Sequence, residues 1–481
     1  MSLRQKAIRG AMWSAVEKWG AQLASTAIFL LLARLLGPET FGLVALANVF
    51  LAFMRIFLDQ GFAQAIIQKD ELEPEHLDTA FWTSVLMGAL FILMIFMGAG
   101  FVANFYDEPQ LAPIIRWMSF SFLFGGLSSV QSAILKRNMQ FKAFAARSLV
   151  ATVACGIAGV GAALAGLGIW SLVIKEFVFG LTGAILLWSV SNWKPGLRFS
   201  PSHFKELFSF GINIIGFNFL NFFNRRSDDI LIGYFLGPVA LGYYSVAYRL
   251  LLIMTQVLTT VTTQVALPTF SRIQKEREKM RNAYYKVTGL TSLISFPAFT
   301  LVAVLAPEIV HCFFGEQWIQ SIAVMRVLAL IGILHSISQF NGTVLLATGK
   351  PAIRLAIQCL NAFCNVLVFI IVVRWGIVAV ALGYVVRGYI LFPLSLAAVK
   401  NTIGIDIKRY LSQFRTPIVS IAFMASIILA SKHLIGEQIS PYLSLPLLAI
   451  LGGLINLLFI YFLSPMLFKN IKEILKLSYN E

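Results

Sequence analysis

Amide and charged side chains interrupt several apolar stretches of the sequence, and they share one face of the helix that each stretch would form. The clearest case lies between residues 207 and 235. At about 100° per residue, one stripe of that helix holds Asn218, Asn221, Arg225, Asp228 and Asp229, with Arg226 at its edge. A guanidinium group there can donate several hydrogen bonds to an anion, above all phosphate, and amide side chains suit sugar hydroxyls. The stripe therefore predicts a binding site for a polar molecule that carries phosphate.

Polar residues in other apolar stretches extend this prediction. The further candidates are Lys18, Gln22 and Ser25 within 13–36, Asn48, Arg55 and Asp59 within 41–67, Tyr248 and Arg249 within 240–268, and Arg387 within 377–399. Arg249 and Arg387 have no acidic residue within one helical turn, which favours them as anion ligands. By contrast, Arg225 and Arg55 each have an aspartate four residues further on, so these charges could simply neutralise each other in the helix packing. The sequence leaves both interpretations open.

The composition requires that these helices lie in a membrane. The chain has 481 residues, of which 58% are hydrophobic and only 12% are charged, and its mean hydropathy is +0.80. A soluble globular chain is about a quarter charged, and a chain as apolar as this one has too little polar surface to cover itself in water. Soluble enzymes, disordered chains and disulfide-stapled secreted domains are therefore excluded. The sequence predicts an all-α integral membrane protein.

A helix needs about 20 apolar residues to cross a bilayer, and a window of that length finds about fourteen candidate spans. They are 13–36, 41–67, 79–104, 111–135, 146–166, 169–190, 207–235, 240–268, 285–314, 321–347, 353–374, 377–399, 414–434 and 442–467. Lysine and arginine gather in alternate loops, for example 136–147, 194–205 and 272–286, so we expect both termini in the cytoplasm. The same bias explains most of the formal net charge of +16, and no nucleic acid partner is needed.

The sequence contains an internal repeat. A Leu-Gly-Pro-x-x-x-Gly motif occurs at 36–42 and again at 236–242, and an arginine and a Gly-Ile pair recur in the same order at a similar offset. Two parallel six-helix lobes with a polar cavity between them are typical of transporters. We therefore expect an N-terminal lobe over 1–190, a cytoplasmic linker over 191–206, a C-terminal lobe over 207–400 and two additional helices over 401–481.

The sequence predicts no catalytic residue, no cofactor and no metal site. The four cysteines, Cys155, Cys312, Cys359 and Cys364, form no Cys-x-x-Cys pair and lie in or near apolar runs. We therefore interpret them as small buried residues. His335 could be a protonation site, although a lone histidine in such a stretch is more commonly a hydrogen-bonded core residue. No nucleotide-hydrolysing motif is found, so we expect the energy for transport to come through the membrane or from a partner.

Several motifs resemble those of Wzx-type polysaccharide-export flippases. They are Leu32-Ala33-Arg34-x-Leu36-Gly37-Pro38-x-x-Phe41-Gly42, Phe314-Gly315-x-x-Trp318 and Ala347-Thr348-Gly349-Lys350. Two more resemble the colanic-acid-exporter branch of that group, namely Pro268-Thr269-Phe270-Ser271-Arg272-x-Gln274 and Leu207-Phe208-x-Phe210-Gly211. The resemblance covers nearly the whole chain and implies the fold shared by multidrug-and-toxin extruders and peptidoglycan-precursor flippases.

The resemblance also implies a function. It implies a bacterial inner-membrane protein that translocates undecaprenyl-diphosphate-linked oligosaccharide for exopolysaccharide or lipopolysaccharide synthesis. The basic residues of the stripes would then hold the diphosphate. The other partners implied are membrane lipids and the polysaccharide polymerase machinery.

Two rival functions remain to be weighed. A drug or cation antiporter on the same fold should prefer acidic residues in its cavity, and the arginines without acidic neighbours disfavour it. A membrane polysaccharide polymerase or glycosyltransferase would need a substantial outer loop with catalytic residues, whereas the outer loops here are short. We therefore expect a transporter that works by alternating access, and not an enzyme.

Overall fold

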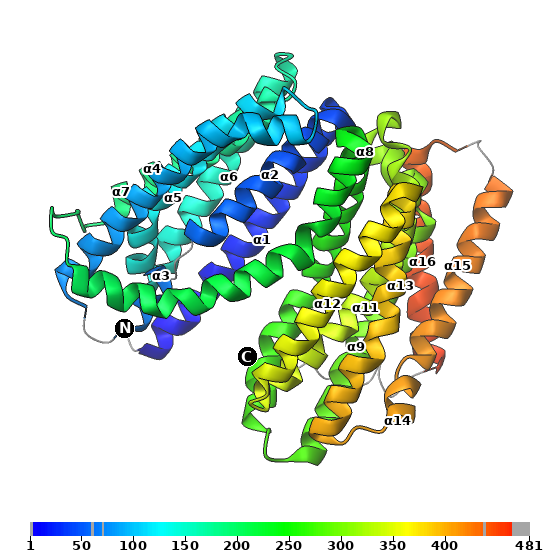
Figure 1. The fold of residues 1–481 in the computed structure, drawn as a ribbon. Helices are drawn as coiled ribbons and strands as arrows, with labels where there is room; N and C mark the ends of the chain where they lie inside the picture. Colours follow the sequence, from blue (N-terminus) through cyan, green and yellow to red (C-terminus); the bar gives the residue numbers. More distant parts are fainter. Residues whose placement is uncertain (1–2, 59–61, 70–71, 436–438, 464–481) are drawn as a thin grey trace. The chain divides into compact units, whose positions relative to one another are not determined.

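The structure is a computed structural model that describes residues 3–463 apart from 59–61, 70–71 and 436–438. For residues 3–12, 14–18, 58, 206–215, 217, 220, 260–264, 435 and 463 it describes the backbone alone. All regular elements within the described residues are helices (Figure 1). An apolar segment in lipid must satisfy its own backbone N–H and C=O groups, and a helix does so. The chain divides into two compact units, Met1–Gly242 and Tyr243–Glu481.

The first unit is a bundle of long helices. Its elements are α1 (Leu3–Leu35), α2 (Pro38–Leu58), α3 (Phe62–Gln68), α4 (Pro74–Phe105), α5 (Leu111–Arg137), α6 (Phe141–Leu164), α7 (Trp170–Val190) and the first part of α8 (Pro201–Arg272). Several of them begin with proline, whose missing N–H costs nothing in the first turn. α4 packs on α5, α6 on α7 and α1 on α6. The predicted span 41–67 covers parts of both α2 and α3, and residues 59–61 between them lie outside the described residues.

α8 is interrupted at Gly237, where φ is 80° and ψ is 177°. This left-handed conformation strongly favours glycine, because a side chain there would clash with the backbone. The helix resumes at Pro238, a residue that suits the first turn of a helix. The two predicted spans 207–235 and 240–268 thus follow each other across a backbone break without an intervening loop.

The two copies of the Leu-Gly-Pro-x-x-x-Gly motif contact each other reciprocally within the first unit. A Cβ atom added to Gly42 would lie 1.7 Å from the carbonyl oxygen of Pro238, and one added to Gly242 would lie 1.9 Å from that of Pro38. Glycine at these two positions therefore allows the backbones of α2 and α8 to touch. This reciprocal contact supports the internal repeat inferred from the sequence.

The second unit has its own core. After the remainder of α8 it contains α9 (Arg277–Val304), α10 (Ala306–Ile309), α11 (Ser321–Ala347), α12 (Pro351–Val372), α13 (Ile377–Ile403), α14 (Ile407–Ser412), α15 (Arg415–Ile435) and α16 (Pro441–Leu463), with short π and 3-10 segments at Val310–Phe314, Glu316–Trp318 and Val373–Trp375. α11 packs on α9 and α13, and α15 packs on α9 and α16. The predicted span 285–314 is too long, because α9 ends at Val304, ahead of Pro307, which has no N–H to donate.

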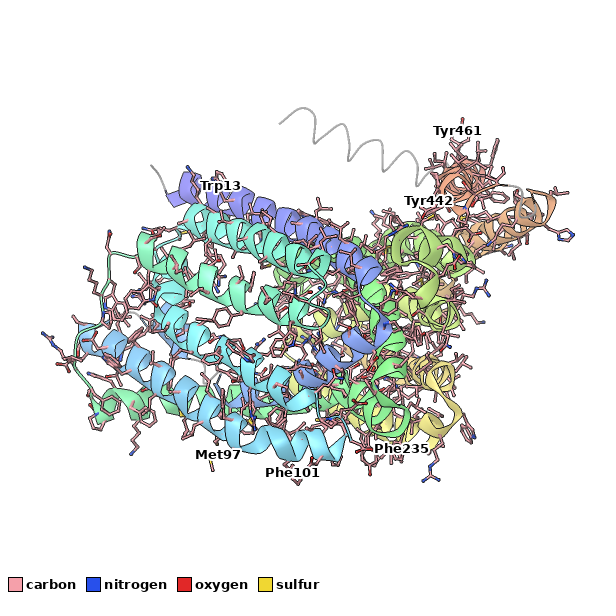
Figure 2. The ribbon with its side chains drawn as sticks, turned by 90° about the horizontal axis from the view of Figure 1, so that it is seen from above. Trp13, Met97, Phe101, Phe235, Tyr442 and Tyr461 are labelled. Atoms are coloured by element: carbon pink, nitrogen blue, oxygen red, sulfur yellow. The ribbon has the colours of Figure 1, made fainter. Side chains whose placement is uncertain are left out.

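The described helices have the lengths and surfaces of membrane spans. Twelve of them are long and apolar enough to cross a bilayer, the one at Asn221–Thr259 containing the break at Gly237, and Trp19–Leu35 is a shorter apolar helix. Large apolar side chains such as Met97 and Phe101 point outward (Figure 2), as expected where lipid and not water is the solvent. The predicted all-α membrane fold is confirmed, while the total of fourteen spans stays a prediction.

Candidate functional site

The first part of α8 carries the predicted charged stripe, and its acidic residues are buried. Asp228 and Asp229 have only 4% and 6% of their surface exposed. The Nη1 atom of Arg226 lies 2.9 Å from Oδ2 of Asp229, and Oδ1 of Asp228 accepts a hydrogen bond of 3.0 Å from the backbone N–H of Asp229. Arg226 thus compensates a charge that would otherwise be costly to bury.

The ion pair differs from the one that the sequence suggested. Spacing alone offered Arg225 as the partner of Asp229, but the partner is Arg226, three residues away instead of four. Both spacings bring side chains together on a helix, so the choice depends on the neighbouring helices. Arg225 is exposed on α8 and forms no ion pair within the described part of the chain. It is therefore available to a ligand.

The other stripe residues of the first unit lie on α1, α2 and α8. Gln22 donates a hydrogen bond of 3.3 Å to Oγ1 of Thr26, and Arg55 is exposed near the end of α2. The rest are half-buried, and they are Ser25, Asn48, Asn218 and Asn221. The Lys18 side chain and Asp59 lie outside the described residues, so the suggested pairing of Arg55 with Asp59 stays a prediction.

Aromatic packing sets the distance between α2 and α8. The ring of Phe53 lies 5.4 Å from that of Phe222, centroid to centroid, in a small core that also contains Val49 and Ile56. Further along, Tyr106 follows the last residue of α4 and faces Gly233, whose added Cβ would lie 3.4 Å from its ring. Burial, and then the negative charge of Asp229, raise the pKa of Tyr106 to about 12. The phenol therefore keeps its proton at neutral pH and remains a hydrogen-bond donor.

In the second unit, Arg387 on α13 is the centre of a polar cluster. Its Nη1 atom donates a hydrogen bond of 2.6 Å to Oδ1 of Asn361 on α12, and its Cζ atom lies 5.1 Å from the centroid of the Tyr384 ring. The Nε atom is buried and has no hydrogen-bond partner. Among the described residues, no carboxylate forms an ion pair with this guanidinium. Its charge is thus only partly compensated by an amide and an aromatic face.

Two more residues complete this cluster, which we call the Arg387 cluster (Tyr248, His335, Asn361, Tyr384 and Arg387). The Tyr248 ring on α8 lies 6.2 Å from that of Tyr384, and Oη of Tyr384 lies 3.5 Å from Nε2 of His335 on α11. His335 is thus hydrogen-bonded, as its interpretation as a core residue expects. The predicted ligand Arg249, next to Tyr248, is exposed.

Sequence reasoning missed two members of this cluster, Asn361 and Tyr384. Tyr384 stands three residues before Arg387, so helical spacing could have placed it beside the guanidinium. Asn361 comes from another helix, and the only signal for it in the sequence was an amide side chain within an apolar run. The unpartnered guanidinium N–H of Arg387, next to an amide, a histidine and two phenols, is suited to an anionic oxygen and its neighbouring hydroxyls.

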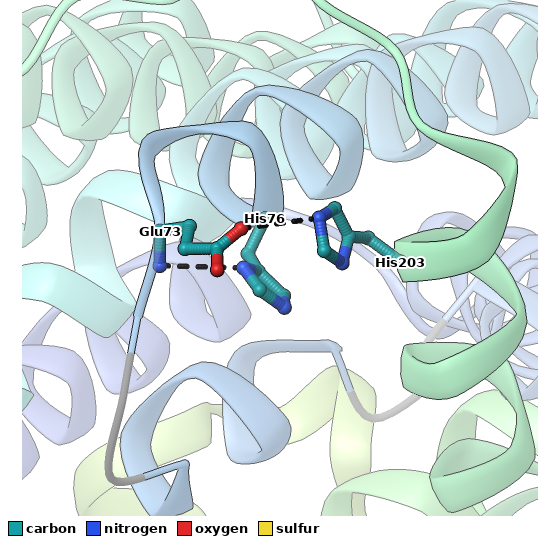
Figure 3. Close-up of side chains that lie close together, drawn as sticks. All are labelled: Glu73, His76 and His203. Atoms are coloured by element: carbon teal, nitrogen blue, oxygen red, sulfur yellow. Dashed lines mark hydrogen bonds and ion pairs between the residues drawn. The ribbon is translucent and has the colours of Figure 1, made fainter.

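Just ahead of the predicted spans 79–104 and 207–235, one group within the described residues has the side chains to hold a metal ion. Glu73 and His76 at the start of α4 and His203 at the start of α8 have ligand atoms that all lie within 4.8 Å of one another (Figure 3). The four cysteines, which all lie within the described residues, form no disulfide. Cys155 is buried as predicted, whereas Cys312, Cys359 and Cys364 are only half-buried, so the prediction of burial was wrong for these three.

Comparison with known proteins places the chain in a family. The family model described as polysaccharide biosynthesis protein matches residues 31–323, more than half of the chain. The chain belongs to the polysaccharide biosynthesis protein family. A succinoglycan biosynthesis transport protein, ExoT of Rhizobium meliloti, is 30% identical to this family member over 69% of the chain and 67% of its own length. The lipopolysaccharide biosynthesis protein WzxC of Escherichia coli is 26% identical over 87% of the chain and 86% of its own length.

Solved structures agree on the fold of this family member. The lipid II flippase MurJ, in an inward closed conformation, superposes with a TM-score of 0.77 at 14% identity, covering 96% of this chain and 100% of that one. An inward-facing multidrug resistance transporter of the MATE family gives a TM-score of 0.63 at 13% identity, covering 80% of this chain and 94% of that one. The resemblance to Wzx-type flippases and the expected fold are both confirmed, and the chain is a multi-pass membrane protein of polysaccharide biosynthesis.

Proposed function

We propose that this protein is a flippase that moves lipid-linked oligosaccharide repeat units across the bacterial inner membrane, from the cytoplasmic side, for polysaccharide synthesis. The observation that carries the proposal is the guanidinium of Arg387, which lies in a membrane-spanning helix with a buried Nε atom that has no partner. A buried, charged donor without a partner costs about 1–3 kcal/mol or more. A bound anion would remove that cost, which is a physical reason for the site to bind one.

The chemistry of the Arg387 cluster supports a sugar phosphate as the occupant. Arg387 would donate to a phosphoryl oxygen, while Asn361 holds the guanidinium from the other side at 2.6 Å. The phenols of Tyr248 and Tyr384 and the ring of His335 would donate to, or accept from, neighbouring oxygens. The lipid chains would remain in the bilayer throughout.

Family relatives support the substrate class. One is named a succinoglycan biosynthesis transport protein, and another is named a probable low-salt glycan biosynthesis flippase, Agl15 of Haloferax volcanii. We infer that the transported oligosaccharide is linked to undecaprenyl diphosphate. We also infer that both termini of the chain lie in the cytoplasm and that polysaccharide polymerase machinery receives the translocated substrate. The site would be exposed to each side of the membrane in turn. An inside-negative membrane potential of about 100 mV favours the outward movement of two negative charges by roughly 4–5 kcal/mol. This value is an upper limit if basic residues move with the substrate.

The test is transport by purified protein in liposomes. Lipid-linked oligosaccharide with a labelled sugar is placed in the inner leaflet, and its appearance outside is followed with an enzyme that cannot cross the membrane. Arg387→Gln should slow the appearance by about 10-fold or more, the equivalent of losing one charged hydrogen bond. The control is Arg374→Gln, which alters an exposed arginine that follows α12 in the same unit. Equal rates for the wild type and Arg387→Gln would refute the role of the cluster.

A second assay separates this function from that of an antiporter. The same liposomes are loaded with a cationic drug under a proton or sodium gradient. Drug movement that needs the protein, together with no movement of the lipid-linked sugar, would refute the flippase proposal and favour the drug or cation antiporter.

A further inference from the structure

The start of α4 and the start of α8 bring two histidines face to face, just ahead of the apolar spans 79–104 and 207–235 that the sequence predicts. The ring centroids of His76 and His203 lie 3.8 Å apart. The Nε2 atom of His203 lies 3.4 Å from Oε2 of Glu73 and 3.8 Å from Oε2 of Glu75. The two imidazoles and the Glu73 carboxylate have ligand atoms that all lie within 4.8 Å of one another (Figure 3), and the Glu75 carboxylate lies beside His203.

The surrounding contacts hold these side chains in place. The linker before α8 is fastened to α4 by hydrogen bonds, because Oδ1 of Asp78 accepts from the N–H of Gly196 at 2.9 Å and Trp82 donates to the Gly196 carbonyl at 2.7 Å. His76 is 2% exposed, whereas His203 is more open, with 19% of its side chain exposed. The site is thus supported by buried structure on one side and open to solvent ions on the other.

Both ring nitrogens of His76 face N–H donors. The Nζ atom of Lys69 lies 2.5 Å from its Nε2 atom, and the backbone N–H of Glu73 points at its Nδ1 atom from 3.3 Å. A neutral imidazole has one acceptor nitrogen and one N–H, so it cannot accept both of these bonds. A metal ion on Nδ1 would replace the contact with the Glu73 N–H. Nε2 would then carry the ring proton, so the Lys69 ammonium would have to turn away from it.

We propose that Glu73, His76 and His203, with Glu75 as the fourth ligand, form a site for a divalent transition-metal ion of the Zn²⁺ class. Two imidazole nitrogens with two carboxylate oxygens favour Zn²⁺ over Mg²⁺ or Ca²⁺, which prefer oxygen ligands alone. Bonds of about 2.0–2.2 Å in a tetrahedron place ligand atoms roughly 3.4 Å apart. The separation of Glu73 and His203 already has that value at 3.4 Å. The other separations within the group of Glu73, His76 and His203 are at most 4.8 Å, and Glu75 lies 3.8 Å from His203, so the remaining ligand atoms would have to move closer together.

The bound ion would tie the first turn of α8 to the first turn of α4. α8 is the helix that carries the Arg226–Asp229 pair, and its start follows the linker of 191–200. The metal would therefore hold the linker end of α8 in one position relative to α4. This inference is independent of the proposed function, because it rests on no residue of the Arg387 cluster.

The experiment measures metal binding by the full chain in detergent, purified with an affinity tag that contains no histidine and stripped with a chelator. Isothermal titration with Zn²⁺ should show about one ion per chain. Addition of Co²⁺ should give the intense visible absorption of tetrahedral coordination. His203→Gln should weaken binding by at least about 10-fold, and Glu73→Gln should also weaken it. The control is His433→Gln, at an exposed histidine of α15.

Thermal unfolding shows whether each variant is folded, so that a loss of metal binding can be distinguished from a failure to fold. Zn²⁺ should raise the Tm of the wild type and of His433→Gln, while leaving that of folded His203→Gln unchanged, and an excess of Mg²⁺ should not replace it. Wild-type protein that is folded but binds no Zn²⁺ at about 100 μM, well above the Kd of a genuine site, would overturn the proposal. Equal affinity in wild type and His203→Gln would also overturn it.

Discussion

The reciprocal contact between the two repeat motifs yields a quantitative prediction. In Gly42→Ala the new Cβ would lie 1.7 Å from the Pro238 carbonyl oxygen, whereas carbon and oxygen normally approach to about 3.3 Å. The backbones of α2 and α8 must therefore separate by roughly 1.5 Å. The three atoms nearest the new methyl group, O, C and Cα of Pro238, all belong to backbone, so no side chain can rotate away. Overpacking of this kind costs typically 1–3 kcal/mol, and we expect the upper end of that range.

The motif supplies its own control and a test of the reciprocity. A Cβ at Gly37 would meet nothing within 4 Å, so Gly37→Ala should change stability by less than about 1 kcal/mol. In the double variant Gly42→Ala with Gly242→Ala, the gap opened for the first methyl group also accommodates the second. The double variant should therefore lose clearly less stability than the sum of the losses of the two single variants.

The measurement is thermal unfolding of each purified variant in the same detergent. Gly42→Ala and Gly242→Ala should each lower the Tm by on the order of 5 °C, with Gly37→Ala close to the wild type. If Gly42→Ala is as stable as Gly37→Ala, the close approach of the two backbones is wrong. If the double variant loses the full sum, the two contacts are independent and the reciprocity is wrong.

Two further predictions concern single groups. Burial first, and then two neighbouring carboxylates, raise the pKa of Glu108 above its usual 4.5. The folded state therefore binds this proton more tightly than the unfolded state, and the resulting stability is lost as pH rises through the folded pKa. The Tm of Glu108→Gln relative to wild type should increase between about pH 4 and about pH 7, and an equal difference at both pH values would contradict this. Tyr284→Phe removes a buried hydrogen bond of 2.6 Å to Oδ1 of Asn341 and should lower the free energy of unfolding by about 1–3 kcal/mol, which would be measured as a lower Tm. The control Tyr234→Phe, at an exposed tyrosine, should change the Tm little. Equal Tm values for the two variants would count against the hydrogen bond.

Much of the fold could be predicted because it depends on local properties of the chain. Hydropathy placed the spans, since any apolar run of about 20 residues satisfies its backbone as a helix in lipid. The repeated motif predicted two related halves, and its glycines and prolines mark the breaks of α8 and the start of α2. Boundaries were less certain where the hydropathy continues through a proline, as it does from α9 into α10.

The candidate site was predictable only in part. Helical spacing identified Arg387 and the charged part of α8, because an uncompensated charge in an apolar run is visible in the sequence alone. The same spacing suggested Arg225 as the partner of Asp229, whereas the structure pairs Asp229 with Arg226.

Contacts between helices were decided by the tertiary structure alone. Asn361 beside Arg387, and His76 facing His203, join positions whose separation in the sequence follows no helical period. Side chains on different helices meet where ridges, small residues and linkers let the backbones approach. The sequence by itself therefore determined which segments lie in the membrane and which charges they carry. The packing of those segments determined which charges are compensated by neighbouring side chains.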